Sequence, residues 1–409
     1  MTPRERVVDF FGLRKSIVAM LLMAILVGLG EKMAERFLPI YLLALGGGIL
    51  SVGFLNAMDN LLSALYAFPG GYLSERLGYK RALAVFNLVA LSGYLIVILF
   101  PHWLAVIIGA AFFLSWSAIS LPATMGLVSR SLPLEKRTMG VSVHSLVRRI
   151  PMALGPVTGG VLIGIYGERA GIRLAFVAAL ILGIVSLVLQ QAMIEDDRTR
   201  GRAERRPLSL WRRMTPDLRN LLASDILIRF AEQIPYGFVV IWCMKHNGIS
   251  AVQFGVLTAI EMVTAMLIYI PVAYLADRTT KKPFVLITFV HFTLFPLILL
   301  FSHSFRMMVI AFIIRGLKEF GEPTRKALIM DLAPEDQKAG MFGLYYLIRD
   351  LIVSGAAFVG GFLWLLSPEV NLLAATACGL TGTLTFALRG RDPKGDERKS
   401  RMDFPGPMG

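Results

Sequence analysis

The chain has 409 residues, of which 56% are hydrophobic and only 17% are charged, and its formal net charge is +14. A soluble chain carries about a quarter charged residues, so this composition excludes a soluble enzyme, a disordered chain and a disulfide-stapled scaffold. A bilayer-spanning helix needs about 20 apolar residues, and a chain with a mean hydropathy of +0.65 supplies them many times over. We therefore expect an all-α membrane protein.

Twelve apolar segments follow one another in two sets of six, each set forming a predicted six-helix bundle. The first set is 16–43, 50–73, 82–101, 103–128, 139–166 and 172–194, and the second is 219–244, 252–275, 284–302, 306–330, 340–366 and 370–388. The predicted domains are a bundle over 1–195, a basic linker over 196–218, a second bundle over 219–390 and a disordered tail over 391–409. The first segment is too long for the apolar region of a cleavable signal.

Lysine and arginine concentrate in every second loop between the predicted spans, and the loops between these carry few charges. The basic loops therefore lie on one side of the predicted membrane. Because cytoplasmic loops carry the excess of positive charge, we expect a multi-pass protein of the cytoplasmic (plasma) membrane with both termini, the linker and the tail in the cytoplasm. The positive charge thus reflects orientation in the bilayer. No RNA- or DNA-binding motif accompanies it, so no nucleic-acid partner is expected.

The two sets of segments are related by an internal repeat. Pro122 and Pro323 lie 201 residues apart, and the acids Asp59 and Glu261 lie 202 apart. In the first segment of each set the charges align at an offset of 197 residues, pairing Lys32 with Arg229 and Glu35 with Glu232. Two bundles built from one repeated unit are a recurring plan of secondary transporters.

The loop after the second segment reads Gly71-Tyr-Leu-Ser-Glu75-Arg76-Leu-Gly78-Tyr-Lys80-Arg81. It resembles the loop motif of the major facilitator superfamily, with glutamate in place of the usual aspartate. A degenerate copy without the glycines contains Asp277 and Arg278. The resemblance implies a gate on the cytoplasmic side, formed by Gly71, Glu75, Arg76, Gly78, Lys80, Arg81, Asp277 and Arg278. For Lys80 and Arg81, a role in membrane orientation alone is an equal alternative.

A second motif lies in the fifth segment, where Gly155, Pro156, Gly159 and Gly160 resemble the sequence typical of proton antiporters of that superfamily. Pro151 stands where the first glycine of that motif is expected. The resemblance implies efflux driven by protons.

Ionisable residues recur inside the predicted spans. Each costs about 2.5–3.5 kcal/mol at the bilayer centre on insertion scales, so a retained charge is expected to face a cavity or a partner. The candidates for a cavity that binds substrate and protons are Glu31, Lys32, Glu35, Arg36, Asp59, Arg148, Arg149, Asp225, Arg229, Glu232, Gln233, Glu261, Arg315, Glu319, Glu322, Arg349 and Asp350. The resemblance implies that the helices carrying them surround the central cavity.

Two roles are open for these charges. More than half are expected to be held in structural pairs or in gates between the bundles. The pairs within reach are Glu31 or Glu35 with Lys32 or Arg36, Asp225 with Arg229, Arg315 with Glu319, and Glu322 with Lys326. The alternative is function. Lys32 and Arg229, one in each half, are suited to bind a carboxylate or phosphate between them. The candidates for proton carriage are Glu35, Glu232, Asp59 and Glu261.

The sequence therefore predicts a secondary active transporter that moves a small organic solute by alternating access, proton-coupled and with efflux favoured. The alternatives are uptake or export of an organic anion, bound by Lys32, Arg229, Arg148 and Arg149, and a non-transporting membrane sensor on the same fold. No nucleotide-binding loop and no nucleophile–base arrangement is visible, so no enzyme activity, cofactor or metal is expected. The expected partners are the solute, protons and the lipid bilayer, and the fold can work as a monomer.

Overall fold

The computed structural model describes residues 15–114, the positions 116, 120 and 124, and residues 134–194, 208–278, 280–334 and 338–392. These residues form helices and the turns between them, and no strand occurs in this part of the chain. Eight of the helical stretches among them are long and apolar enough to cross a membrane. The predicted all-α membrane class is therefore confirmed.

The first six predicted segments correspond to six helices. They are α2 (Lys15–Glu35), α3 (Leu38–Ala44), α4 (Ile49–Leu77), α5 (Tyr79–Leu99), α6 (Trp103–Phe113) and α8 (Leu134–Met193). The predicted segment 16–43 is divided into α2 and α3 because Pro39, which lacks a backbone N–H, starts a new helix at its first turn. The fifth and sixth segments both lie in α8, which leaves helical geometry at Gly167, with φ 80° and ψ 170°.

The second six segments divide in the same way. They contain α9 (Pro216–Gln233), α10 (Val239–Ile241), α11 (Ala251–Arg278), α12 (Lys282–Leu300), α13 (Phe305–Leu317), α14 (Glu322–Leu332), α15 (Lys338–Leu366) and α16 (Pro368–Arg389). The predicted segment 306–330 is interrupted between α13 and α14, where Gly321 caps α14 and Pro323 occupies its first turn. This break brings several charged side chains close together, as described below.

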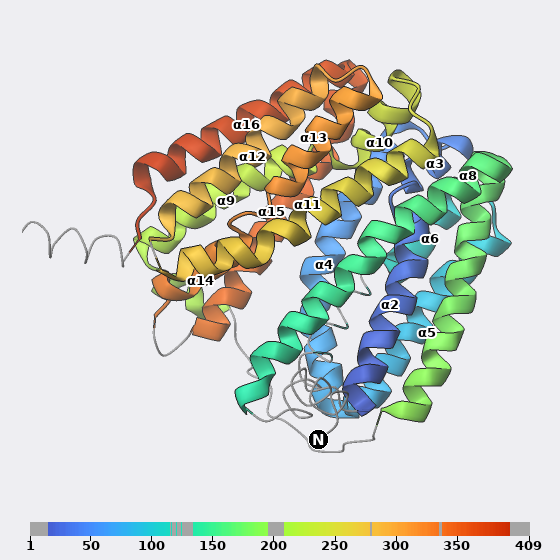
Figure 1. The fold of residues 1–409 in the computed structure, drawn as a ribbon, viewed down its shortest axis with the longest axis horizontal. Coiled ribbons are helices and arrows are strands. Elements are labelled where there is room, and N and C mark those ends of the chain that lie inside the picture. Colours follow the sequence, from blue (N-terminus) through green and yellow to red (C-terminus); the bar gives the residue numbers. More distant parts are fainter. Residues whose placement is uncertain are drawn as a thin grey trace, which may run out of the picture. The chain divides into compact units, whose positions relative to one another are not determined.

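The chain divides into two compact units. Unit 1 comprises Met1–Ala203 and Phe238–Ala259, and unit 2 comprises Glu204–Gly237 and Ile260–Gly409. These units differ from the predicted bundles over 1–195 and 219–390, which follow the sequence repeat. The boundaries of the bundles stay a prediction. Within unit 1, α2 lies along α8, and within unit 2, α9, α12 and α16 lie side by side (Figure 1).

Each unit has an aromatic or aliphatic core. In unit 1 the Phe176 ring of α8 lies 6.1 Å from the Tyr41 ring of α3 and 5.5 Å from the Phe113 ring of α6, measured between ring centroids. In unit 2 the Phe289 ring of α12 lies 5.1 Å from the Phe386 ring of α16. All five side chains are buried, so these contacts join helices that are distant in the sequence.

Close contacts at glycines fix the structural register of the repeat. A Cβ atom at Gly159 of α8 would meet the Met33 carbonyl of α2, and a Cβ atom at Gly360 of α15 would meet the Ile234 carbonyl after α9. Gly159 and Gly360 are 201 residues apart, and so are Met33 and Ile234. The first helices of the two halves therefore correspond at 201 residues.

A second pair of contacts gives nearly the same offset. Gly30 packs against Ala179 in unit 1, and Ala231, 201 residues after Gly30, packs against Gly379 in unit 2. The predicted alignment of the first segments at 197 residues is therefore wrong by about one helical turn. The equivalent pairs are Ala24 with Asp225, Gly28 with Arg229 and Glu31 with Glu232.

Candidate functional site

Unit 2 holds a continuous network of ion pairs. Five acids and five buried or half-buried bases form it, and the exposed Lys326 lies 3.5 Å from Glu322 at its edge. Its members are Asp225, Arg229, Glu232, Glu261, Arg315, Lys318, Glu322, Arg325, Arg349 and Asp350. They come from α9, α11, α13, α14, α15 and the turn between α13 and α14.

Asp225 is the centre of one end of this network and is fully buried. It forms an ion pair with Arg325, accepts a hydrogen bond of 3.0 Å from the Tyr345 hydroxyl, and lies 3.5 Å from Arg349 Nη1. Arg325 also donates two hydrogen bonds to Glu322, of 2.8 and 2.7 Å. Both Asp225 oxygens thus have partners, as a buried charge requires.

The other end of the network surrounds Glu232. Its carboxylate lies 2.5 Å from Arg229 Nη1 and 2.7 Å from Lys318 Nζ. Lys318 Nζ is also 3.5 Å from Glu261, whose second base is Arg315 at 3.3 Å. Each of these acids therefore faces two cations.

The charges of unit 1 are arranged differently. On α2, Lys32 Nζ lies 3.0 Å from Glu31 and also binds Glu35, so one base serves two acids. On α4, the half-buried Asp59 side chain forms no ion pair or hydrogen bond within the described part of the chain. Its electrostatic neighbours are the α2 charges and Arg36.

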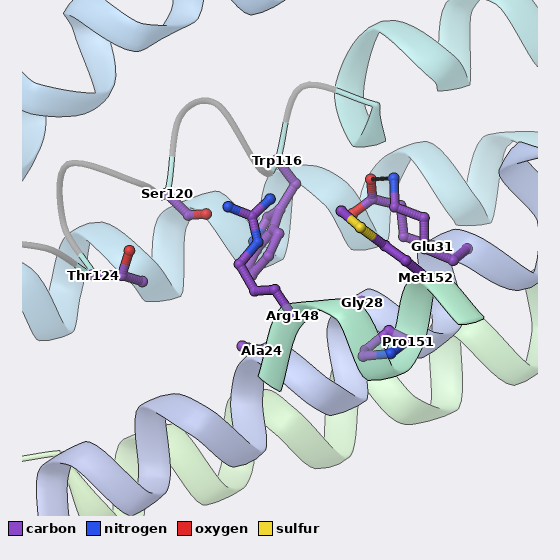
Figure 2. Close-up of a pocket in the computed structure, with 10 residues that line it drawn as sticks. Ala24, Gly28, Glu31, Trp116, Ser120, Thr124, Arg148, Pro151 and Met152 are labelled. Carbon is purple, nitrogen blue, oxygen red and sulfur yellow. Dashed lines mark hydrogen bonds and ion pairs between the residues drawn. The ribbon is translucent and has the colours of Figure 1, made fainter. Parts of the chain in front are cut away.

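Unit 1 also contains a small cavity between α2, α8 and the positions 116, 120 and 124 (Figure 2). Its volume is about 20 Å³, enough for roughly one water molecule. The half-buried Arg148 side chain extends from α8 toward Ser120 and Trp116. Within the described residues Arg148 has no ion pair or hydrogen bond, and its nearest charges are Glu31 and Arg149.

Trp116 connects this cavity to a chain of buried hydrogen bonds. Its Nε1 donates to Asn87 Oδ1 at 2.7 Å, and Asn87 Nδ2 donates to Gln190 Oε1 at 2.6 Å. Gln190 Nε2 in turn donates to the Lys80 carbonyl at 2.9 Å, beside the predicted gating loop. This chain was not predicted from the sequence, although Asn87 and Gln190, two amides in apolar spans, are a signal for it.

Several predicted pairs have different partners in the structure. Lys32 contacts Glu31 and Glu35 as predicted. Asp225 pairs with Arg325 rather than the predicted Arg229.

Arg315 pairs with Glu261 rather than the predicted Glu319. As with Asp225, the prediction considered only pairs within one helix, whereas the observed pairs join different helices.

Arg325, Tyr345 and Lys318 are the site residues absent from the predicted cavity set. Arg325 is 1% exposed and follows Glu322 by three residues, so it lies on the same helix face. The predicted partner of Glu322, Lys326, does lie 3.5 Å away, but its side chain is 48% exposed. The i,i+3 spacing was the available signal for Arg325.

The remaining candidates border these groups. They are Arg36 in the turn after α2, Arg149 beside Arg148 in α8, Gln233 at the end of α9 and Glu319 after α13, all half-buried. Among the described residues no group of three or more His, Cys, Asp or Glu is placed to hold a metal ion.

The predicted gating loop is described in part. Gly78 precedes α5 with φ 83°, a conformation that favours glycine. Lys80 is half-buried, and Arg76 and Arg81 are exposed. Gly71 and Glu75 lie in α4, and Asp277 and Arg278 end α11, but the surroundings of these four residues lie outside the described part of the chain.

The glycines of the fifth segment lie at helix contacts. A Cβ atom at Gly155 would be 2.7 Å from Lys32 Cβ, so α8 approaches α2 next to its charges. Gly160 faces the Ala251 carbonyl at the start of α11, within unit 1. Pro151 packs against Gly28, where an added Cβ would be 3.1 Å from the proline ring.

Relatives of the chain carry the names of MFS-type transporters and of a resistance protein. It is 20% identical over 366 residues, 87% of this chain and 90% of the relative, to an uncharacterised MFS-type transporter of Methanocaldococcus jannaschii. It is 26% identical over 153 residues to the quinolone resistance protein NorA of Staphylococcus aureus, which covers 37% of this chain and 39% of that relative.

Solved transporter structures share the fold. The nucleoside transporter NupG matches with a TM-score of 0.77 and 12% identity, covering 92% of this chain and all of that chain. The human organic anion transporter TETRAN matches with a TM-score of 0.64 and 14% identity, covering 91% and 99%. At these identities the likeness concerns the fold alone. Residues 20–220 and 221–405 each match the Major Facilitator Superfamily, and the chain belongs to that family of membrane transporters.

Proposed function

We propose that this protein is a proton-coupled secondary transporter that exports a small organic solute by alternating access. The observation that carries the proposal is the unequal pairing of two acids related by the repeat. Glu261 of unit 2 lies 3.3 Å from Arg315 and 3.5 Å from Lys318. Its counterpart Asp59 has no such partner among the described residues of unit 1. An acid without a fixed cation is the better proton carrier, because its ionised form is not held by a neighbouring positive charge.

The proton would be shared between Asp59 and the α2 acids. Glu31 and Glu35 compete for the single ammonium of Lys32, and Arg36 is the other cation near Asp59. Binding one proton changes the net charge of this group by one. A ligand that binds two conformations unequally shifts their populations, and this is how we expect the proton to drive the transport cycle.

Export is supported by the glycine-rich contacts of α8 with α2 and α11 and by the likeness to a protein named for quinolone resistance. The distribution of Lys and Arg supports a plasma-membrane location with both termini in the cytoplasm. We expect the monomer to be sufficient, since each half contributes one bundle of the repeat.

Everted membrane vesicles that contain the full chain test this function. With the lumen acidified, accumulation of a quinolone, an aromatic carboxylate or an organic cation is expected, and nigericin, which collapses the pH gradient, should abolish it. Accumulation that survives nigericin would contradict proton coupling. Accumulation in right-side-out vesicles alone would contradict export, and no movement in either orientation would favour the non-transporting sensor.

The variant Asp59→Asn should lose gradient-driven accumulation. Asp217→Asn is the matched control, because Asp217 lies at the start of α9 with its side chain 33% exposed and only a long ion pair, of 3.8 Å, to Arg391. Equal accumulation by both variants would remove Asp59 from the proton path.

A further inference from the structure

An arginine that occurs at equivalent positions of the repeat has ion-pair partners in unit 2 and none among the described residues of unit 1. Arg148 and Arg349 are 201 residues apart, in α8 and α15. Arg349 lies 3.5 Å from Asp225 and 2.7 Å from Asp350. Arg148, facing the cavity of unit 1, has no ion pair or hydrogen bond within the described residues.

The repeat identifies what unit 1 lacks. At the same offset of 201, Ala24 stands in the place of Asp225 and Arg149 in the place of Asp350, so both acids that compensate Arg349 are missing. Thr124 stands in the place of Arg325, the second cation on Asp225. Ala24 and Thr124 line the same cavity as Arg148. In unit 1 the guanidinium of Arg148 therefore faces Ala24 at the position where Arg349 faces the Asp225 carboxylate in unit 2.

We propose that Arg148 binds the carboxylate of an organic anion in this cavity, at the place that the Asp225 side chain occupies against Arg349 in unit 2. The inference rests on the proposed transport function and names its substrate class. A charge inside the membrane is expensive unless it has a partner, and the bound carboxylate supplies that partner.

The wall of the cavity fits such a ligand. A guanidinium binds a carboxylate through two parallel hydrogen bonds. In unit 2 the Tyr345 hydroxyl also donates to Asp225, at 3.0 Å, and in unit 1 the Ser120 hydroxyl lies on the cavity wall. The Trp116 ring and Met152 line the same cavity and offer apolar surface to the body of the anion (Figure 2).

One acid also lines this cavity and must be considered as a competitor. The Glu31 carboxylate lies 3.0 Å from Lys32 Nζ, which it shares with Glu35, and it is also an electrostatic neighbour of Arg148. At about 20 Å³ the cavity holds roughly one water molecule. A whole solute therefore enters only when the cavity widens, as alternating access requires.

Thermal unfolding of the purified full-length protein with benzoate tests the inference. Benzoate should raise the unfolding temperature progressively as its concentration rises above its dissociation constant, whereas benzamide, of the same shape without the charge, should not. The variant Ala24→Asp places a carboxylate at the position equivalent to Asp225. This variant should lose the response to benzoate. Without ligand it should unfold at or above the temperature of the wild type. The variant Ala24→Asn should keep the response.

A second variant guards against poor folding of the first. Arg148→Gln should weaken benzoate binding about tenfold or more, since a charge-assisted hydrogen-bonded pair is lost. Arg306→Gln, an exposed arginine at the start of α13, is the control and should bind as the wild type does. A wild-type protein without a benzoate response, or a response that persists in both Ala24→Asp and Arg148→Gln, would overturn the inference.

Because binding is measured without a gradient, its failure is distinct from failure of the proposed function. Proton-driven transport of another solute without benzoate binding would overturn the carboxylate site alone. Benzoate binding that depends on Arg148, in a protein that moves no solute, would overturn the transport proposal and leave the site.

Discussion

Asp225 illustrates how a single buried charge is tolerated inside a membrane protein. Its side chain is fully buried, and its oxygens are shared by Arg325, Arg349 and the Tyr345 hydroxyl. The sequence was sufficient to single out Asp225 and Arg349, because ionisable residues in apolar spans are conspicuous. It was not sufficient to choose Arg325 over Lys326 as the buried base, since both are within reach of Glu322 on one helix.

Removing the buried base should be far more costly than removing the exposed one. Arg325→Met leaves Asp225 with a weaker set of partners, and we expect a loss of about 3–5 kcal/mol in unfolding free energy. Lys326→Met, whose side chain is 48% exposed, should cost less than about 1 kcal/mol. Thermal unfolding in detergent measures both. Equal losses would show that Arg325 is not the base that compensates Asp225, and Asp225→Asn should partly rescue Arg325→Met.

The hydrogen-bonded chain that begins at Trp116 gives a second residue-scale prediction. Asn87→Leu leaves the Trp116 Nε1 donor and one end of the Gln190 amide without partners, so we expect a loss of about 1–3 kcal/mol. Ser92→Ala on the same helix is the control, because its hydroxyl bonds only to the Val89 carbonyl of α5. If Asn87→Leu unfolded at the wild-type temperature, the hydrogen bonds between Trp116, Asn87 and Gln190 would not contribute to stability.

At the scale of elements, helix positions were predictable and their interruptions were not. The twelve apolar segments all contain helices, but 16–43, 219–244 and 306–330 are each interrupted. Pro39 and Pro323 were the available signals. The alignment of the first segments failed because it followed the charges, whereas the register is set by small residues at helix contacts, such as Gly159 against Met33.

The contact between α2 and α8 can be tested with one pair of glycine variants. A Cβ atom at Gly155 would lie 2.7 Å from Lys32 Cβ and 2.8 Å from the Lys32 backbone carbon, so Gly155→Ala should destabilise the protein by about 1–3 kcal/mol. At Gly355 of α15 nothing lies within 4 Å of an added Cβ. Gly355→Ala should be neutral or stabilise the helix by about 0.5–1 kcal/mol. The reverse order of unfolding temperatures would contradict the close approach of α2 and α8.

At the scale of the whole molecule, one repeated unit has diverged in its charges. In unit 2 five acids and five bases form one continuous network of ion pairs, whereas unit 1 keeps Asp59 and Arg148 outside any ion pair among its described residues. The sequence predicted which residues carry charge in each half. It did not predict this division, because pairing across helices depends on the three-dimensional register. We interpret unit 2 as the rigid partner and unit 1 as the half that binds protons and solute.

The most direct test of this division is transport by Asp59→Asn in proteoliposomes, measured in two modes with the same exported solute. Exchange of labelled for unlabelled solute needs no net proton movement, whereas accumulation against a gradient does. We predict that Asp59→Asn retains exchange and loses pH-driven accumulation. Accumulation at the wild-type level by Asp59→Asn would contradict the account.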